Sequence, residues 1–332
     1  MKAIVCLVAM SALGLGLWSR GSVTTESYCG SCDASAMVAL DHDLFAVADD
    51  EDSIMRIYSR QLGRVPVLRT NLSAFLGFGF RDEADIEGSA RVGDHVYWIT
   101  SHGNNRKGKE QESRQRFFAV TTKRSGDSVK IETVGRPYTG LLDDLLREPR
   151  LFRYNLHASA NLPPKTPGAL NIEGLAATPE GHLLIGFRNP VPRGGALLVP
   201  LLNPSEVIQG QRARFGEPRQ IDLGGYGIRS IEPWRNGYLI VAGSVDGKGK
   251  SRLYEWPGAN QPPRLVPQVD FTGINPEAIA VMNTTGVEEL FVVSDDGTRL
   301  INGVECKKLR DPNKMEFRAA TFPLVTEVAG KP

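Results

Sequence analysis

The chain has 332 residues, with 39 Lys and Arg against 38 Asp and Glu, so its net charge is +1. Hydrophobic residues make up 41% and charged residues 23%, which is typical of a globular fold and excludes a mainly disordered chain. Nucleic acids and acidic membranes select proteins with a basic surplus, so the balanced charge argues against both as partners. The length allows one large or two medium domains.

Residues 1–22 have the pattern of a secretory signal peptide. Lys2 supplies a positive charge, and an almost purely apolar run follows from Ala3 to Leu17. A membrane-spanning helix needs about 20 apolar residues, so this shorter run favours a cleaved signal over the alternative, an N-terminal anchor. We therefore expect a periplasmic or secreted monomer, residues 23–332, with no membrane span after signal cleavage.

Removal of the signal leaves three cysteines, at Cys29, Cys32 and Cys306. Exported proteins meet oxidising conditions, so a disulfide is expected. Cys29 and Cys32 could pair with each other, or Cys306 could pair with one of them. Three thiols leave one unpaired, and the sequence does not identify it.

A repeating pattern runs through the rest of the chain: a short polar step, a hydrophobic strand, a turn and a stronger hydrophobic strand. The steps begin at residues 33, 85, 171, 230 and 275. Blades of a β-propeller typically need about 40–50 residues, and radial repetition protects the sheet edges. We predict an all-β chain that forms one β-propeller of five or six blades. The alternative fold, a β-sandwich, does not explain the recurring step.

Two segments leave details of this propeller open. The segment after Val304 could form a sixth blade, complete the last blade or pair with the first. The longest interval contains an insertion at 136–170, in which leucines between Leu141 and Leu146 recur at helical spacing before Pro149. This pattern predicts a short helical insertion between blades, which is either a lid or rim for a site or a surface loop.

The polar step repeats a carboxylate. The innermost strand of each blade lines the central tunnel, so equivalent residues form a ring. The glutamates at the repeated position are Glu87, Glu173, Glu232 and Glu277, with Ser35 in the first repeat. Two residues upstream stand Asp33, Asp85, Asn171, Ser230 and Asn275. Like charges at close range repel by about 1–4 kcal/mol per pair, so the ring needs a compensating cation.

That cation is either a metal ion or arginine. Ca²⁺ takes six to eight oxygen ligands in proteins. The candidate metal ligands are Asp85, Glu87, Asn171, Glu173, Glu232 and Glu277. Arg188, Arg229 and Arg299 lie near the same steps and could pair with the glutamates instead. No organic cofactor is expected, and the acidic run at 49–52 is interpreted as a solvated turn with a secondary option of peripheral Ca²⁺.

Four of these segments resemble an uncharacterised bacterial family, domain of unknown function 3616. They are residues 32–52, 84–88, 171–175 and 227–232, and the resemblance extends over about residues 30–325. It implies a secreted or periplasmic propeller without an assigned activity. The step is more distantly similar to that of phytase-like esterase propellers and calcium-binding lactonase propellers. That similarity implies Ca²⁺ at the tunnel mouth, with Glu87, Asn171 and Glu173 as ligands.

Two functions are compatible with this sequence. The first is a binding or scaffold protein of unassigned activity, whose partner is a protein, a glycan or a small anionic ligand. The alternative is a Ca²⁺-assisted phosphoester or ester hydrolase with its site at the tunnel mouth. In the hydrolase His102 would be the acid–base residue, and Arg188 and Arg229 would bind the substrate.

Overall fold

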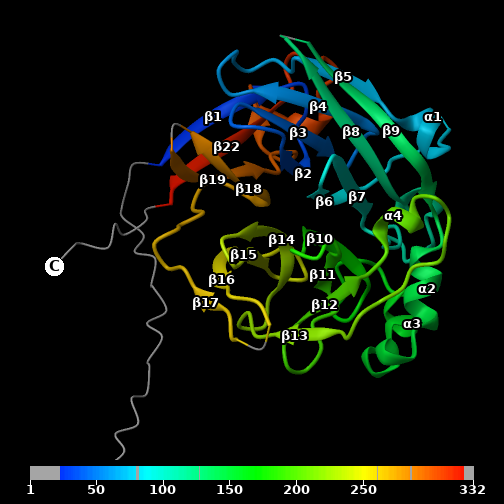
Figure 1. Ribbon diagram of the computed structural model, residues 1–332. Coiled ribbons are helices and arrows are strands. Elements are labelled where there is room, and N and C mark those ends of the chain that lie inside the picture. Colours follow the sequence, from blue (N-terminus) through cyan, green and yellow to red (C-terminus); the bar gives the residue numbers. More distant parts are fainter. Residues whose placement is uncertain (1–22, 80–81, 127, 260, 285, 325–332) are drawn as a thin grey trace, which may run out of the picture.

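Five antiparallel sheets of four strands stand in a ring around a central axis, as the computed structural model shows (Figure 1). It describes residues 23–79, 82–126, 128–259, 261–284 and 286–324. The predicted signal peptide at 1–22 lies outside these described residues. The innermost strands β2, β6, β10, β14 and β18 contact one another in turn around the ring. The predicted β-propeller is therefore confirmed, with five blades.

Each blade is one sheet, whose strands follow one another from the tunnel outward. Blade 1 is β2 (Ala34–Ala39), β3 (Leu44–Asp49), β4 (Ile54–Ser59) and β5 (Leu68–Asn71). Blade 2 is β6 (Ile86–Val92), β7 (His95–Thr100), β8 (Phe117–Ser125) and β9 (Ser128–Tyr138). Blade 3 is β10 (Asn171–Ala177), β11 (Leu183–Asn189), β12 (Ala196–Leu201) and β13 (Arg219–Ile221). Blade 4 is β14 (Gly227–Trp234), β15 (Gly237–Gly243), β16 (Arg252–Trp256) and β17 (Arg264–Leu265). Blade 5 is β18 (Pro276–Thr284), β19 (Val287–Ser294), β22 (Glu316–Pro323) and β1 (Thr24–Cys29).

The ring is closed by strands from both ends of the described chain. β1 pairs antiparallel with β22, and Tyr28 lies opposite Phe317 in this register. The segment after Val304 thus contributes the third strand of blade 5, and β1 supplies the fourth. The option of a sixth blade in that segment is wrong.

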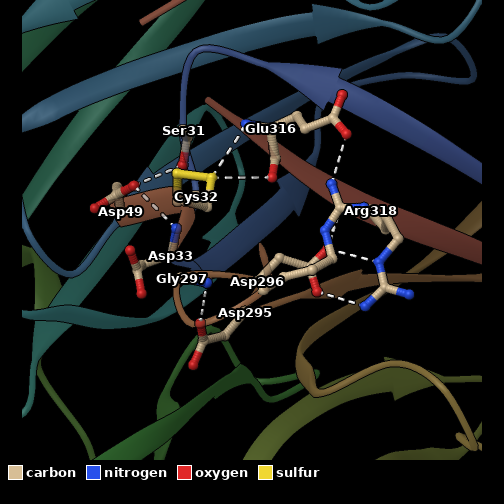
Figure 2. The surroundings of a disulfide bond; sticks show 11 residues. Ser31, Cys32, Asp33, Asp49, Asp295, Asp296, Gly297, Glu316 and Arg318 are labelled. Atoms are coloured by element: carbon tan, nitrogen blue, oxygen red, sulfur yellow. Dashed lines mark hydrogen bonds and ion pairs between the residues drawn. A yellow bond between two sulfur atoms is a disulfide. The ribbon is translucent and has the colours of Figure 1, made fainter. Parts of the chain in front are cut away.

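A disulfide between Cys32 and Cys306 strengthens the same closure (Figure 2). Cys32 precedes β2, and Cys306 follows the small separate hairpin of β20 (Leu300–Ile301) and β21 (Val304–Glu305), which lies in the chain between β19 and β22 of blade 5. Cys29 is the free thiol. The disulfide therefore joins the first and last blades, which answers the pairing question that the sequence left open.

One apolar cluster lies at each of the five blade interfaces. The middle strands contribute to two clusters, because successive side chains point to opposite faces of a sheet. In β7, Val96 and Trp98 pack toward blade 1, whereas Tyr97 and Ile99 pack toward blade 3. Close packing restricts residue size as well: a Cβ at Gly174 would lie 2.7 Å from Ile228 Cγ2.

The predicted helical insertion follows β9. It consists of α2 (Leu141–Arg147), η2 (Pro149–Tyr154) and α3 (Leu156–Ser159). Leu141, Leu145 and Leu156 are buried in the cluster between blades 2 and 3, so these helices cover the side of the ring (Figure 1). The remaining short helices are α1 (Ser73–Leu76), α4 (Pro204–Val207), η1 (Glu112–Arg114) and η3 (Cys306–Lys308).

Candidate functional site

A β-bulge occurs at the start of every innermost strand. The pairing register skips one residue there: Ser35, Glu87, Glu173, Arg229 and Glu277 in the five blades. A bulge re-aims the side chain of the extra residue. All five of these residues line a single cavity at one end of the tunnel. These five residues therefore form a ring, which includes Ser35, Glu87, Glu173 and Glu277 of the predicted set.

The fourth member of this ring differs from the expectation. The residue at the bulge of β14 is Arg229, and Glu232 lies three residues further along the strand. Glu232 is not among the residues that line the cavity; its Oε1 accepts a hydrogen bond from Val281 N at 3.4 Å. Desolvation raises the pKa of Glu232 to about 8. The repeat pattern is out of register here because it aligns glutamate with glutamate, whereas blade 4 carries an arginine at this position.

The cavity, which we call the cup, has a volume of about 590 Å³. Its carboxylates are Asp33, Asp50, Glu51, Glu83, Asp85, Glu87, Glu173, Glu277 and Asp295. Its cations are Arg106, Arg114, Lys165, Arg188 and Arg229. Further along the inner strands only about 10 Å³ of space remains, among side chains such as Met37, Leu175 and Ile279. The acidic cup is thus closed beneath by apolar packing.

One side of the cup is neutralised by arginine. Arg188 Nη1 lies 2.5 Å from Glu173 Oε1, which also accepts a hydrogen bond from Asn171 Nδ2 at 2.8 Å. Arg229 pairs with Glu277 and donates to Asn275 Oδ1 at 2.8 Å. Burial and the nearby Arg188 lower the pKa of Arg229 to about 10. Glu173 Oε2 has no hydrogen-bond partner among the described residues and lies 3.7 Å from Arg229 Nε. Because each carboxylate here has an arginine, we call these residues the paired half.

The opposite side of the cup lacks such compensation. Oxygen atoms of Asp50, Asp85 and Glu87 all lie within 4.8 Å of one another. Within the described residues Glu87 makes no ion pair and accepts no hydrogen bond, and the buried Oδ1 of Asp50 has no hydrogen-bond partner. Asp85 has one cation, Arg114, with Nη1 at 3.3 Å, and accepts a hydrogen bond from Ser101 Oγ. The other two carboxylates give this side its name: we call Asp50, Asp85 and Glu87 the unpaired half.

Electrostatics in the unpaired half favour a proton or a cation. Burial, followed by the charge of Glu173, raises the pKa of Glu87 well above its usual value. Burial and then Glu87 raise the pKa of Asp50 in the same direction. Burial raises the pKa of Asp85 to about 6, although Arg114 opposes this shift. Each carboxylate therefore makes its neighbours harder to ionise.

Asp50 and Glu51 are absent from the predicted ligands because their acidic run has the composition of a solvated turn. The run ends β3, and only Glu51 is exposed. Asp49 accepts a hydrogen bond from Ser31 Oγ at 2.6 Å, and Asp52 pairs with Arg56. The signal that could have identified the run is its place at the end of the second strand, where blade 3 has Arg188 as the last residue but one of β11.

His102 lies away from these groups. It is 2% exposed and is not among the residues that line the cup. Its Nδ1 is 2.8 Å from Thr100 O, its Nε2 has no hydrogen-bond partner within the described residues, and burial lowers its pKa to about 4. The structure thus gives His102 no route to a ligand in the cup.

The rim of the cup is built from two loops. Pro163, Pro164 and Lys165, at the end of the insertion, line the cup together with Arg106. Asn104 Nδ2 donates to Ala160 O at 2.8 Å, which joins the Arg106 loop to the insertion. The insertion therefore contributes to the rim through its proline-rich end, whereas its helices do not line the cup.

The model of a family described as "Protein of unknown function (DUF3616)" matches residues 33–126 and 131–299. No curated protein matches the sequence.

Solved structures with a similar fold share little sequence with the chain. Glutaminyl cyclase of Myxococcus xanthus is 14% identical, with a TM-score of 0.44 over 91% of this chain and 97% of that one. The allergen Mala s 1 of Malassezia sympodialis is 14% identical, with a TM-score of 0.40 over 88% of this chain and 78% of that one. A Trypanosoma rangeli sialidase mutant is 11% identical, with a TM-score of 0.40 over 84% of this chain and 47% of that one.

Proposed function

Because the chain belongs to this family of proteins of unknown function, we propose a function from the chemistry of its own cup: Ca²⁺-dependent binding of a small anionic ligand. The ion would be held by the unpaired half, Asp50, Asp85 and Glu87. The anion would occupy coordination positions of the ion that face the cup, and cations of the rim would hold it there.

The observation that carries the proposal is the contrast between the two halves of the ring. Glu173 and Glu277 have buried arginine partners, whereas Glu87 has none among the described residues. Asp50 Oδ1 is buried without a partner in the described part of the chain, whereas Glu87 is half-buried. Buried charges are normally paired or coordinate a metal, so a divalent cation is the group that this side of the cup lacks.

The residues fit Ca²⁺ by chemistry and spacing. Ca²⁺ prefers carboxylate and carbonyl oxygens at about 2.3–2.6 Å, so two of its ligand atoms lie at most about 5 Å apart. The oxygens of Asp50, Asp85 and Glu87 satisfy this limit, because all lie within 4.8 Å of one another. Asn171, Glu173, Glu232 and Glu277, also expected as ligands, have other partners, so the proposal does not include them.

We infer an anionic ligand from the cations of the cup that are not paired with a carboxylate among the described residues. Arg188 and Arg229, expected as substrate-binding residues, are already paired with Glu173 and Glu277. Arg106 and Lys165 line the cup, are exposed, and make no ion pair within the described part of the chain. Carboxylates outnumber cations in the cup, so an anion would be repelled until Ca²⁺ reduces the negative potential. Anion binding should therefore require the metal.

Calorimetric titration of the purified protein tests both parts of the proposal, the binding of Ca²⁺ and the binding of the anion. We expect Ca²⁺ to bind the wild type, and glycerol phosphate or galacturonate to bind only after Ca²⁺. Glu87→Gln should raise the Kd for Ca²⁺ at least tenfold. The control Asp94→Asn changes the same charge in the exposed turn after β6 and should bind as the wild type does. Absence of Ca²⁺ binding, or equal binding by Glu87→Gln, would refute the metal site.

Two further variants of the protein test the binding of the anion. Arg106→Ala and Lys165→Ala should retain Ca²⁺ binding, because neither side chain belongs to the unpaired half. Both variants should bind the anion more weakly. If neither probe anion binds the Ca²⁺-loaded wild type, the anion part of the proposal is wrong.

Hydrolysis of a phosphoester or ester is the second candidate. Its support is the cavity of about 590 Å³ beside the unpaired carboxylates, which leaves room for a substrate next to an ion. A bound metal polarises an ester oxygen and lowers the pKa of a coordinated water. Release of nitrophenol from phosphoester and acetate ester substrates, abolished by Glu87→Gln, would establish it. His102 has no role in this scheme, since it does not line the cup.

We further propose that the protein acts as a monomer outside the cytoplasm, in the periplasm or after secretion. The disulfide between Cys32 and Cys306 supports this location, because disulfides persist in oxidising compartments. Among the described residues, none of the helices has the length and apolar character needed to cross a membrane.

A further inference from the structure

We propose that the cup binds a second divalent cation beside the first, through Asp33, Asp50 and Glu51, with Asp50 bridging the two ions. This inference rests on the proposed function, which places the first ion at Asp50, Asp85 and Glu87. The result would be a binuclear centre built by the ends of blades 1 and 2.

Two overlapping sets of carboxylates carry this inference. In the first set, oxygens of Asp50, Asp85 and Glu87 lie within 4.8 Å of one another. In the second set, the same limit holds for Asp33, Asp50 and Glu51. Asp50 is the shared member, and its Oδ1 is buried without a hydrogen-bond partner. A carboxylate with two oxygens can serve two ions, and paired metals in proteins are typically about 3.5–4 Å apart.

Asp33 provides an independent observation that points to a ligand. It is 5% exposed and lines the cup. Its backbone N donates to Asp49 Oδ2 at 3.3 Å, but its carboxylate accepts no hydrogen bond and forms no ion pair among the described residues (Figure 2). Burial and the charge of Asp295 raise its pKa to about 8. The charge of Lys307 opposes this shift, but no described cation forms a direct ion pair with the Asp33 carboxylate.

The surrounding structure holds Asp33 in this position. Cys32, the preceding residue, is tied to Cys306 by the disulfide. On the other side Gly297 packs so closely that a Cβ there would clash with the Asp33 carboxylate. Figure 2 shows the carboxylate of Asp33 beside this disulfide. The side chain is thus confined by blade 1 and by the loop after β19.

Lys307 of η3 is the described cation whose charge acts on both Asp33 and Glu51. Its Nζ lies 3.2 Å from Glu51 Oε1 but makes no ion pair with Asp33 or Asp50. Asp49 and Asp295 add further negative charge around Asp33. One ammonium does not balance the three carboxylates of Asp33, Asp50 and Glu51, so the set can still accept a metal ion.

Mn²⁺ is a suitable probe, because it accepts carboxylate ligands and reports on its neighbours by electron paramagnetic resonance. We expect two Mn²⁺ per chain at saturation and the spectrum of a spin-coupled pair. Asp33→Asn should lower the stoichiometry to one and restore the six-line spectrum of an isolated ion. Asp85→Asn should also remove the spin coupling. Asp50→Asn should raise the Kd of both Mn²⁺ ions at least tenfold.

Two further variants show whether a loss of Mn²⁺ binding comes from the loss of a ligand or from misfolding. Glu51→Gln changes an exposed side chain, so it should fold normally and weaken only the second ion. Asp94→Asn should retain both ions and the coupled spectrum. One uncoupled Mn²⁺ per chain, unchanged by Asp33→Asn and Glu51→Gln, would overturn the second site and leave the proposed function intact. Absence of any bound Mn²⁺ or Ca²⁺ would overturn both.

Discussion

Glu87 and Glu173 occupy the same bulge in neighbouring blades, yet only Glu173 has an arginine, with Arg188 Nη1 2.5 Å away. The difference comes from the next strand. Phe187 pairs with Ile172 as Thr100 pairs with Ile86, so Arg188 of blade 3 corresponds to Ser101 of blade 2. Ser101 donates a hydrogen bond to Asp85 and brings no charge. One arginine in place of serine therefore separates a structural carboxylate from one that is free to bind a cation.

Glu87→Gln should have opposite effects with and without Ca²⁺. Without the ion, and at a pH high enough to ionise Glu87, the substitution removes one charge from a repelling cluster and should raise the free energy of unfolding by about 1 kcal/mol. With Ca²⁺ at a hundred times its Kd, the wild type should gain about 2.7 kcal/mol, and the variant should not. Thermal unfolding in excess Ca²⁺ and in chelator measures both effects. A variant that is destabilised in chelator would contradict this account.

Arg188→Met should destabilise the protein strongly, whatever the Ca²⁺ concentration. Glu173 is 3% exposed, and loss of one partner of a buried ion pair costs about 3–5 kcal/mol. The double variant Arg188→Met with Glu173→Gln should recover much of this loss, because no uncompensated charge stays buried.

Denaturant unfolding measures the Arg188 effect. The matched control is Arg214→Met, which breaks an exposed pair with Glu206 and should cost less than about 1 kcal/mol. Equal losses in the two arginine variants would show that burial of the Glu173 pair is unimportant.

The metal-free protein should lose stability as the pH rises. The pKa of Glu232 is about 8 in the folded chain, against an ordinary value of 4.5. A carboxyl whose pKa is raised by folding stabilises the native state below pH 4.5, and this contribution is lost as the pH rises toward 8. Asp33, with a pKa of about 8, acts in the same direction. Unfolding in chelator at about pH 5, 6.5 and 8 should show this decline.

Glu232→Gln separates this contribution from the cup, because Glu232 is not among the residues that line it. The variant should reduce the decline in stability between about pH 5 and 8, whereas Asp94→Asn should leave it unchanged. An increase in stability with pH in the metal-free wild type would show that these carboxyls are ionised in the folded state.

Removal of the disulfide should weaken ring closure. Cys32 and Cys306 are 274 residues apart, and loss of a native disulfide typically costs about 2–5 kcal/mol. The double variant Cys32→Ser with Cys306→Ser should therefore unfold at lower temperature. Cys29→Ser removes the free thiol and should unfold as the wild type does. A drop in unfolding temperature for Cys29→Ser alone would assign a structural role to that thiol.

The propeller and most of its strands could be predicted from the sequence, because both faces of the middle strands are buried and the polar step recurs before each inner strand. Leu141 and Leu145 likewise revealed α2 through helical spacing. Glu87 and Asp85 were expected at the tunnel mouth because equivalent positions of a radial repeat converge, and both line the cup. These inferences depend on local patterns and on symmetry, which the linear sequence contains.

Only the tertiary structure decided how the charges at the mouth are paired. Arg229 replaces a glutamate in the ring, and Asp50 reaches the cup from an acidic run that resembles a surface turn. Both facts depend on bulge register and on side chains from different blades meeting across a few ångströms. The pairing of Cys32 with Cys306 has the same origin, because closure of the ring brings together residues that are distant in the chain. Sequence patterns describe each blade separately, whereas the cup consists of contacts between blades.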